Sequence, residues 1–361
     1  MSHYEERLEA DLARIRERIA DMAREVAQGV QNAVQALQTG NHELAAQTIL
    51  NDHPVNRTMR EIDRLCHAFI AVHLPTAGPL RMLSSAIRAN IAFERIGDYA
   101  VTIARVSEQL STPPHGLMGT ELERVANQAV IMLGQAVDAF NNLNAEAARA
   151  TMVLEQEMEY NLDTVYAELT NNPDQDKVRD LLAVFVVLTH LKRVADQAKN
   201  LCEETVFIVT GQTKTPKVYN VVFVDQDNSG LSQMAEAVAR KTFPESGNYS
   251  SGGRQPAGAL NGAVARFLDE HGMDTSDARP RALELTHQQL VATHVVVSLQ
   301  GPARDYFEKI PFHTTAVEWD VGQLPADTDD AQTVEGLEAI YRDIAVRVRD
   351  LMVTLRGENA P

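Results

Sequence analysis

The chain has 361 residues and a formal net charge of -17. That length exceeds what one hydrophobic core usually serves, so we expect two domains. The acidic excess argues against a nucleic-acid binder and against a protein held at an anionic membrane surface, because both need clustered Lys and Arg. The only cysteines, Cys66 and Cys202, lie far apart in helical sequence and form neither a disulfide framework nor a zinc pattern.

The first 21 residues are rich in charge and lack the apolar core of a signal peptide. No apolar run elsewhere approaches the ~20 residues that span a bilayer. We therefore expect a cytoplasmic protein without membrane insertion.

The first part of the chain is predicted to be helical. Apolar residues step by fours and threes along its start, which places them on one helix stripe: Leu8, Leu12, Ile15, Ile19, Met22 and Val26. Turn residues and prolines divide the sequence into six expected helices over 4–39, 42–73, 75–110, 119–140, 144–171 and 174–210. Long helices with short connections indicate an antiparallel bundle.

The expected bundle repeats itself. The segment FERIGDYAVTIARVSEQL (93–110) has a weaker echo in LKRVADQAKNLCEETVF (191–207), and 50–66 resembles 154–169 in the same way. The sequence thus predicts an all-α domain over 1–212 made of two three-helix repeats.

The pattern changes after a Gly, Thr and Pro linker at 211–218. Short apolar runs suited to buried parallel strands occur at 221–224, 294–299 and 314–317. Helical stretches are expected from Ser232 and over 258–271, 302–309 and 332–355. Strands that alternate with helices predict an α/β domain with a parallel sheet over 218–355.

Oxygen-bearing side chains recur four residues apart on the expected helices. The pairs are Glu94 with Asp98, Asp52 with Asn56, and Glu155 with Glu159, while Asp196 is paired with Lys192. Residues at this spacing project from one helix face, and carboxylates from neighbouring helices build metal sites for magnesium, manganese, iron or zinc. In so acidic a chain the same spacing also describes a solvated face.

The segments NDHPVNRTMREID (51–63), LPTAGPLRMLSSAIRAN (74–90) and ERIGDYA (94–100) resemble the PhoU family of phosphate-uptake regulators over about residues 1–212. The resemblance places the family's metal-cluster motifs on Asp52, Asn56, Glu94, Asp98, Glu155, Glu159 and Asp196. Two positions depart from the pattern. Asn56 is neutral, and Lys192 puts an ammonium beside Asp196 that could pair with it and displace a metal.

This resemblance implies a regulator of phosphate uptake and phosphate-responsive signalling, repressing when phosphate is plentiful. Its partners would be the ATPase of the phosphate ABC transporter and the phosphate-sensing histidine kinase, and the chain would form a homodimer.

The segment VVFVDQDNSGLSQMAEAVAR (221–240) resembles the phosphate-binding loop of low-molecular-weight tyrosine phosphatases and arsenate reductases. Asn228, Ser232 and the Met-Ala-Glu-Ala of 234–237 fit the family's pattern, and the likeness extends over about 218–355. The catalytic cysteine of that family falls on Asp225 and its arginine on Leu231.

These two replacements remove the thiolate nucleophile and the guanidinium that clamps the phosphoryl oxygens, so we expect no phosphatase activity. Asp225 and Asp227 together should repel phosphate. Asp225 either caps the helix at Ser232, or binds a cation with Asp227, or belongs to a loop that has drifted. Asp320 and Asp327 are loosely placed candidates for the general acid.

Two other functions stay open from the sequence. One is an enzyme, either an Asp225-dependent phosphatase or a metal-assisted hydrolase of the bundle. The other is a scaffold whose bundle binds no metal.

Overall fold

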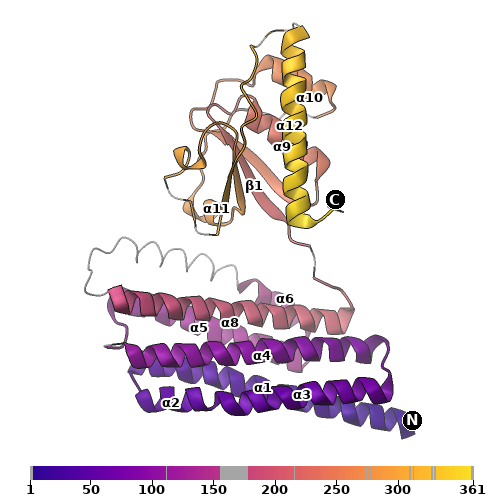
Figure 1. Cartoon of the computed structure of the whole chain (residues 1–361), viewed down its shortest axis with the longest axis vertical. Helices are drawn as coiled ribbons and strands as arrows, with labels where there is room; N and C mark the ends of the chain where they lie inside the picture. The colour runs from indigo at the N-terminus through magenta and orange to yellow at the C-terminus, as the bar shows by residue number, and fades with distance from the viewer. Residues whose placement is uncertain are drawn as a thin grey trace. The chain divides into compact units, whose positions relative to one another are not determined.

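The computed structural model describes residues 3–110, 112–154, 178–214, 216–273, 275–276, 278–308, 310–311, 313–326, 328 and 331–358. Its contacts divide the chain into two compact units, Met1–Lys214 and Thr215–Pro361 (Figure 1). The first unit is a helical bundle and the second is an α/β unit, as the sequence predicts.

The described helices of the first unit are α1 (His3–Thr39), α2 (His42–Leu50), α3 (Asp52–His73), α4 (Ala77–Gln109), α5 (Gly116–Asn141), α6 (Ala145–Met152) and α8 (Val178–Thr210). Helix α4 packs against α1, α3 and α8, and α8 packs against α5 (Figure 1). The predicted stripe of α1 is buried from Ile15 onward in a core shared by the bundle's helices. Burial of that apolar stripe is what holds the long helices together.

The prediction of a single helix over 42–73 is wrong, because the segment forms two helices, α2 and α3, that meet at Asn51. Pro54 explains the break, since it has no N–H to donate to the carbonyl of Leu50 and its ring would clash there. Proline is tolerated in the first turn of a new helix, and α3 begins at Asp52, two residues before it. The break brings Asp52 to a helix start, which matters for the site.

The described residues of the second unit form four parallel strands: β1 (Tyr219–Asp225), β2 (Gly247–Gly253), β3 (Val295–Ser298) and β4 (Thr315–Glu318), in the order β2-β1-β3-β4. Its helices are α9 (Leu231–Thr242), α10 (Gly262–Glu270), α11 (His287–Val291), the short 3-10 helix η2 (Ala303–Asp305) and α12 (Ala331–Arg356). Side chains alternate along β1. Val221 and Phe223 join a core with α9, α10 and α12, whereas Val222 and Val224 join a smaller cluster with Leu290.

Strand β2 was not predicted, because its sequence GNYSSGG contains no apolar run. It is an edge strand that pairs with β1 over its whole length. Glycine is required at its end, since a Cβ on Gly253 would lie 2.7 Å from the backbone nitrogen of Asn228. The helix expected over 302–309 is also shorter than predicted, with only Ala303–Asp305 helical in this stretch.

The side on which strands are added to the sheet switches at β1, because β2 pairs on one side of it and β3 on the other. Loops that follow parallel strands diverge at such a point and leave a crevice at the carboxyl edge of the sheet. Asp225 ends β1 at this edge.

Candidate functional site

The first candidate site is built where α3 begins beside α4. The carboxylate of Asp52 accepts a hydrogen bond from the amide of Asn56, with 2.6 Å between Oδ2 and Nδ2. Its other oxygen, Oδ1, is buried without a hydrogen-bond partner among the described residues. A Cβ on Gly97 of α4 would lie 3.3 Å from that oxygen, so the absence of a side chain at 97 is what lets the two helices approach here.

Glu94 and Asp98 lie near Gly97 on α4, and the charges of these residues and of Asp52 bear on the pKa values of Asp52 and Glu94. Burial raises the pKa of Asp52, and the charge of Asp98 raises it further. Burial likewise raises the pKa of Glu94, followed by the charges of Asp98 and Asp52. Burial and neighbouring carboxylates thus disfavour the charged forms of Asp52 and Glu94, and a bound cation would favour those charged forms.

The matching face of the second repeat is different. Lys192 and Asp196 on α8 form the predicted ion pair, with 3.2 Å between Nζ and Oδ1. The Lys192 ammonium already pairs with this carboxylate, whereas Asp52 in the first repeat has an oxygen without a partner. Asp196 is therefore a poorer candidate metal ligand than Asp52.

The remaining predicted ligands, Glu155 and Glu159, lie outside the described residues. Within the described ranges no three His, Cys, Asp or Glu side chains converge closely enough to hold a metal ion. The unpartnered buried oxygen of Asp52, and the burial and the Asp98 charge that raise its pKa, are the structural features that fit a metal in the first repeat.

The second candidate site is the loop between β1 and α9. The Asp225 side chain is almost fully buried, and both of its oxygens accept backbone hydrogen bonds: Oδ1 from the N–H of Asn228 at 2.5 Å, and Oδ2 from the N–H of Ser232 at 2.8 Å. Of the three alternatives for this residue, helix capping is confirmed. The carboxylate accepts hydrogen bonds from backbone N–H groups that could otherwise donate to a bound anion.

Asn228 fixes the shape of this loop. Its backbone is left-handed, with φ of 51°, a conformation that asparagine tolerates better than most residues. Its side-chain nitrogen donates to the hydroxyls of Ser232 and Ser251, and its oxygen accepts from the Gln233 side chain and the Arg281 backbone. The loop is therefore tied to α9, to β2 and to the segment around 281.

Leu231, at the position where the resemblance places an arginine, is fully buried in the core of the second unit. It supplies no guanidinium. Cys66 and Cys202 belong to α3 and α8 of the first unit, where burial raises the pKa of each thiol, to about 11 and about 12 respectively. Asp320 is exposed just beyond β4, and Asp327 lies outside the described residues.

Three arginines near the loop were missed by the sequence analysis. Arg254 follows β2 and its backbone N–H donates to the Asp225 carbonyl, while Arg279 and Arg281 lie in the segment whose Ala282 bridges to Gly253. Their side chains are exposed. In sequence they lie 24 to 51 residues after Gly230, the last residue of the loop, so only the pairing of that segment with β2 reveals the neighbourhood.

The duplicated bundle with its paired carboxylates defines the first unit as a two-repeat, acidic-face helical domain. The family model of the PhoU domain matches residues 12–107 and 122–205. A PhoU homolog of the phosphate-specific transport system in Pseudomonas putida is 30% identical over 212 residues, which are 58% of this chain and 83% of that protein. The chain belongs to the PhoU family.

The solved structures agree for this unit. The crystal structure of PhoU from Pseudomonas aeruginosa is similar at 29% identity and a TM-score of 0.55, covering 56% of this chain and 99% of that one. An arsenate reductase in the phosphate binding state is similar at 20% identity and a TM-score of only 0.31, covering 38% and 99%. That score is too low to support an argument about the second unit.

Proposed function

We propose that the chain is a regulator of phosphate uptake and of phosphate-responsive signalling. The observation that supports this most directly is the membership of its first unit in the PhoU family, whose relatives are named accessory proteins of the phosphate-specific transport system. In this proposal the chain acts in the cytoplasm, as a homodimer, by contact with the transporter's ATPase and with a phosphate-sensing histidine kinase. None of the described helices has the length and apolarity needed to cross a bilayer.

The test is repression in a bacterium that lacks its own PhoU protein and carries a reporter on a promoter induced by phosphate starvation. We expect the full chain to restore low reporter output in phosphate-rich medium. Capture with the tagged full chain from phosphate-replete cells should recover the transporter ATPase or the kinase. Unchanged high reporter output, with neither partner recovered, would contradict the proposal.

We further propose that the first repeat holds a divalent or trivalent metal ion, such as iron, manganese, magnesium or zinc. Asp52, Asn56, Glu94 and Asp98 would supply its oxygen ligands. The resemblance assigns Glu155, Glu159 and Asp196 to the corresponding motifs of the second repeat. What supports this is the buried, unpartnered oxygen of Asp52 beside Gly97. A bound ion would offset the burial and the neighbouring charges that raise the pKa of Asp52 and Glu94.

Elemental analysis of the purified protein tests this proposal. The Glu94→Gln plus Asp98→Asn variant should lose the metal. The matched control is Glu5→Gln plus Glu9→Gln, which removes two exposed carboxylates at the same spacing from α1 and should keep it. Metal that is absent from the wild type would leave the bundle as a metal-free scaffold, and metal that is unchanged in the first variant would be bound elsewhere; either result would contradict the proposed site.

The enzymatic alternative depends on Asp225 as a nucleophile. Its oxygens already accept two backbone hydrogen bonds and its side chain is shielded from solvent, so it is poorly placed to attack a phosphoryl group. We expect no turnover of an aryl phosphate above background. Turnover that disappears in Asp225→Ala would instead establish the phosphatase.

A further inference from the structure

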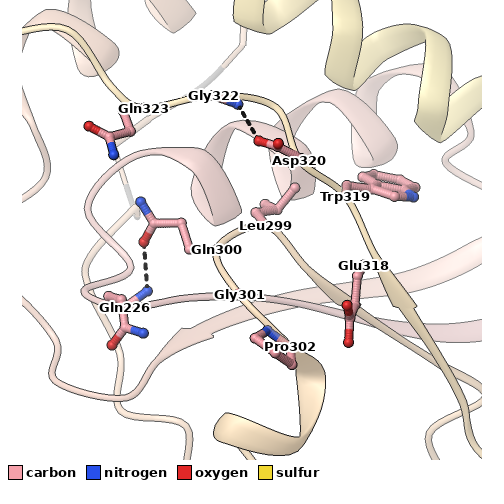
Figure 2. Close-up of a pocket in the computed structure, with 10 residues that line it drawn as sticks. All are labelled: Gln226, Leu299, Gln300, Gly301, Pro302, Glu318, Trp319, Asp320, Gly322 and Gln323. Carbon is pink, nitrogen blue, oxygen red and sulfur yellow. Dashed lines mark hydrogen bonds between the residues drawn. The ribbon is translucent and has the colours of Figure 1, made fainter.

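The second unit contains a pocket of about 640 Å³ at the carboxyl edge of its sheet (Figure 2). Its lining comes from the residue after β1, from the turn after β3 and from the end of β4 with the segment that follows: Gln226, Leu299, Gln300, Gly301, Pro302, Glu318, Trp319, Asp320, Gly322 and Gln323. This edge next to the switch at β1 is where α/β sheets bind ligands, and the volume suits a small molecule.

The charged side chains of the lining are all negative. Two carboxylates, Glu318 and Asp320, and three side-chain amides line the pocket, and its described lining contains no Lys, Arg or His. Figure 2 shows Gln300 between Gln226 and Gln323, with Glu318 across from them. An anion would therefore meet two negative charges and no side-chain cation to compensate for them.

Each carboxylate is held in place by one backbone contact. One Glu318 oxygen accepts from the N–H of Ala303 at 3.2 Å, and one Asp320 oxygen accepts from the N–H of Gly322, also at 3.2 Å. The second oxygen of each has no hydrogen-bond partner among the described residues. Gln300 is fixed as well, since its side-chain oxygen accepts from the backbone of Gln226 at 3.1 Å.

The charges around the pocket preserve its negative character. Asp305 lies beside Gly301, 3.8 Å from where a Cβ would stand, and the exposed Arg304 precedes it. Arg347 lies behind Asp320, where it donates to the Asp320 carbonyl and pairs with Asp343 at 2.9 Å. Arg254 follows β2 and its backbone N–H donates to the carbonyl of Asp225, next to the pocket residue Gln226, but the exposed side chains of Arg254, Arg279 and Arg281 are not part of the described lining.

We propose that this pocket binds a small organic cation that carries several N–H donors, of the polyamine or guanidino-amine class. Ammonium or guanidinium groups match the open oxygens of Glu318 and Asp320, and the amide oxygens and turn carbonyls accept the remaining donors. The site goes beyond the regulation proposed for the bundle, and it selects against the phosphate that the loop's resemblance would suggest.

The chain contains its own reporter for this site, because its only tryptophan, Trp319, lines the pocket. The full chain is titrated with spermidine and with agmatine while Trp319 emission is followed, at about 150 mM salt so that exposed charges are screened. We expect a saturable change with at least one of the two amines and none with inorganic phosphate. Equilibrium dialysis of the same amines gives a second readout of binding.

Two variants locate the binding. Glu318→Gln plus Asp320→Asn keeps an acceptor for Ala303 and for Gly322 but removes both charges, so affinity should fall by about tenfold or more. Glu335→Gln plus Asp350→Asn removes two exposed charges from α12 and should bind as the wild type does.

Three results would overturn the proposal. The first is no saturable binding of either amine by emission or by dialysis. The second is an equal loss of affinity in both variants, which would mean general attraction to an acidic protein. The third is a response to inorganic phosphate or to magnesium ions without one to the amines.

Discussion

The Asp225 side chain hydrogen-bonds backbone amides of the loop that follows β1. Its carboxylate binds the backbone N–H groups of Asn228 and Ser232, one with each oxygen. An asparagine has one acceptor oxygen, and its NH₂ group would face a backbone donor. Because hydrogen bonds to charged groups contribute about 1.5–3 kcal/mol, Asp225→Asn should destabilise the second unit by about 2 kcal/mol.

Urea unfolding followed by Trp319 emission measures this loss. Asp227→Asn is the matched control, because Asp227 uses a single oxygen to accept both the N–H and the hydroxyl of Ser229, and asparagine keeps such an oxygen. We expect the control to change the free energy of unfolding by less than about 0.5 kcal/mol. Equal losses in the two variants would contradict the role assigned to Asp225.

The same residue makes the second unit's stability depend on pH. Burial raises the pKa of Asp225, and the hydrogen bonds from Ser232 and Asn228 oppose that rise only in part; Asp227 adds to it, and Tyr306 also faces the carboxylate. The folded state then binds a proton more tightly than the unfolded state. The contribution of Asp225 to stability should therefore fall as pH rises from about 3.8 through its raised folded pKa.

The measurement is the urea midpoint of the wild type and of Asp225→Asn across that range. As pH rises, the urea midpoint of the wild type should fall relative to that of Asp225→Asn. A difference that is constant, or that shifts the other way, would show that the folded pKa of Asp225 is not raised.

Gly97 lies where α4 comes close to the Asp52 side chain of α3. A methyl group at 97 would lie 3.3 Å from Asp52 Oδ1 and 3.6 Å from a Val55 methyl, so Asp52 must shift by a few tenths of an ångström. The strain opposes the gain of about 1 kcal/mol that alanine brings inside a helix. Gly97→Ala should therefore change stability little but weaken metal binding, as a metal titration would show. Gly134→Ala on α5, which has open space around it, should leave metal binding unchanged.

At the scale of elements, helices and buried strands were predictable where the pattern of apolar residues is strong. The apolar stripe of α1 predicts a helix, and the apolar run of β1 predicts a strand. The break before α3 was missed because Pro54 sits inside an otherwise continuous helical pattern. Strand β2 was missed because backbone pairing with β1 and small residues, rather than apolar side chains, define it.

The packing of α3 and α8 gives a prediction about their thiols. Cys66 and Cys202 are both fully buried, and burial raises the pKa of the two thiols to about 11 and about 12. A thiol reagent attacks the thiolate, so both should react at neutral pH only when the bundle opens. Mass spectrometry after labelling should find both thiols unmodified in native protein and both modified in urea. Fast labelling of the native protein would mean that the bundle is looser than described.

At the scale of the whole molecule, the division into a helical unit and an α/β unit follows from the change of period near residue 215. The partners within each site were harder to predict. That Asp52 meets Gly97, or that Arg254, Arg279 and Arg281 gather by the loop, depends on helix packing and strand pairing between distant segments. The pairing of Lys192 with Asp196 was predictable, because it is set by spacing along one helix.

The capped loop also has a consequence for how the chain can respond to its surroundings. A carboxylate attached to the end of β1 competes for the loop's amides at an effective concentration fixed by its attachment, which is on the order of millimolar or more. A free oxyanion competes only at its own concentration and must also displace a buried side chain. We therefore expect the occupancy of these amides to respond little to the supply of phosphate.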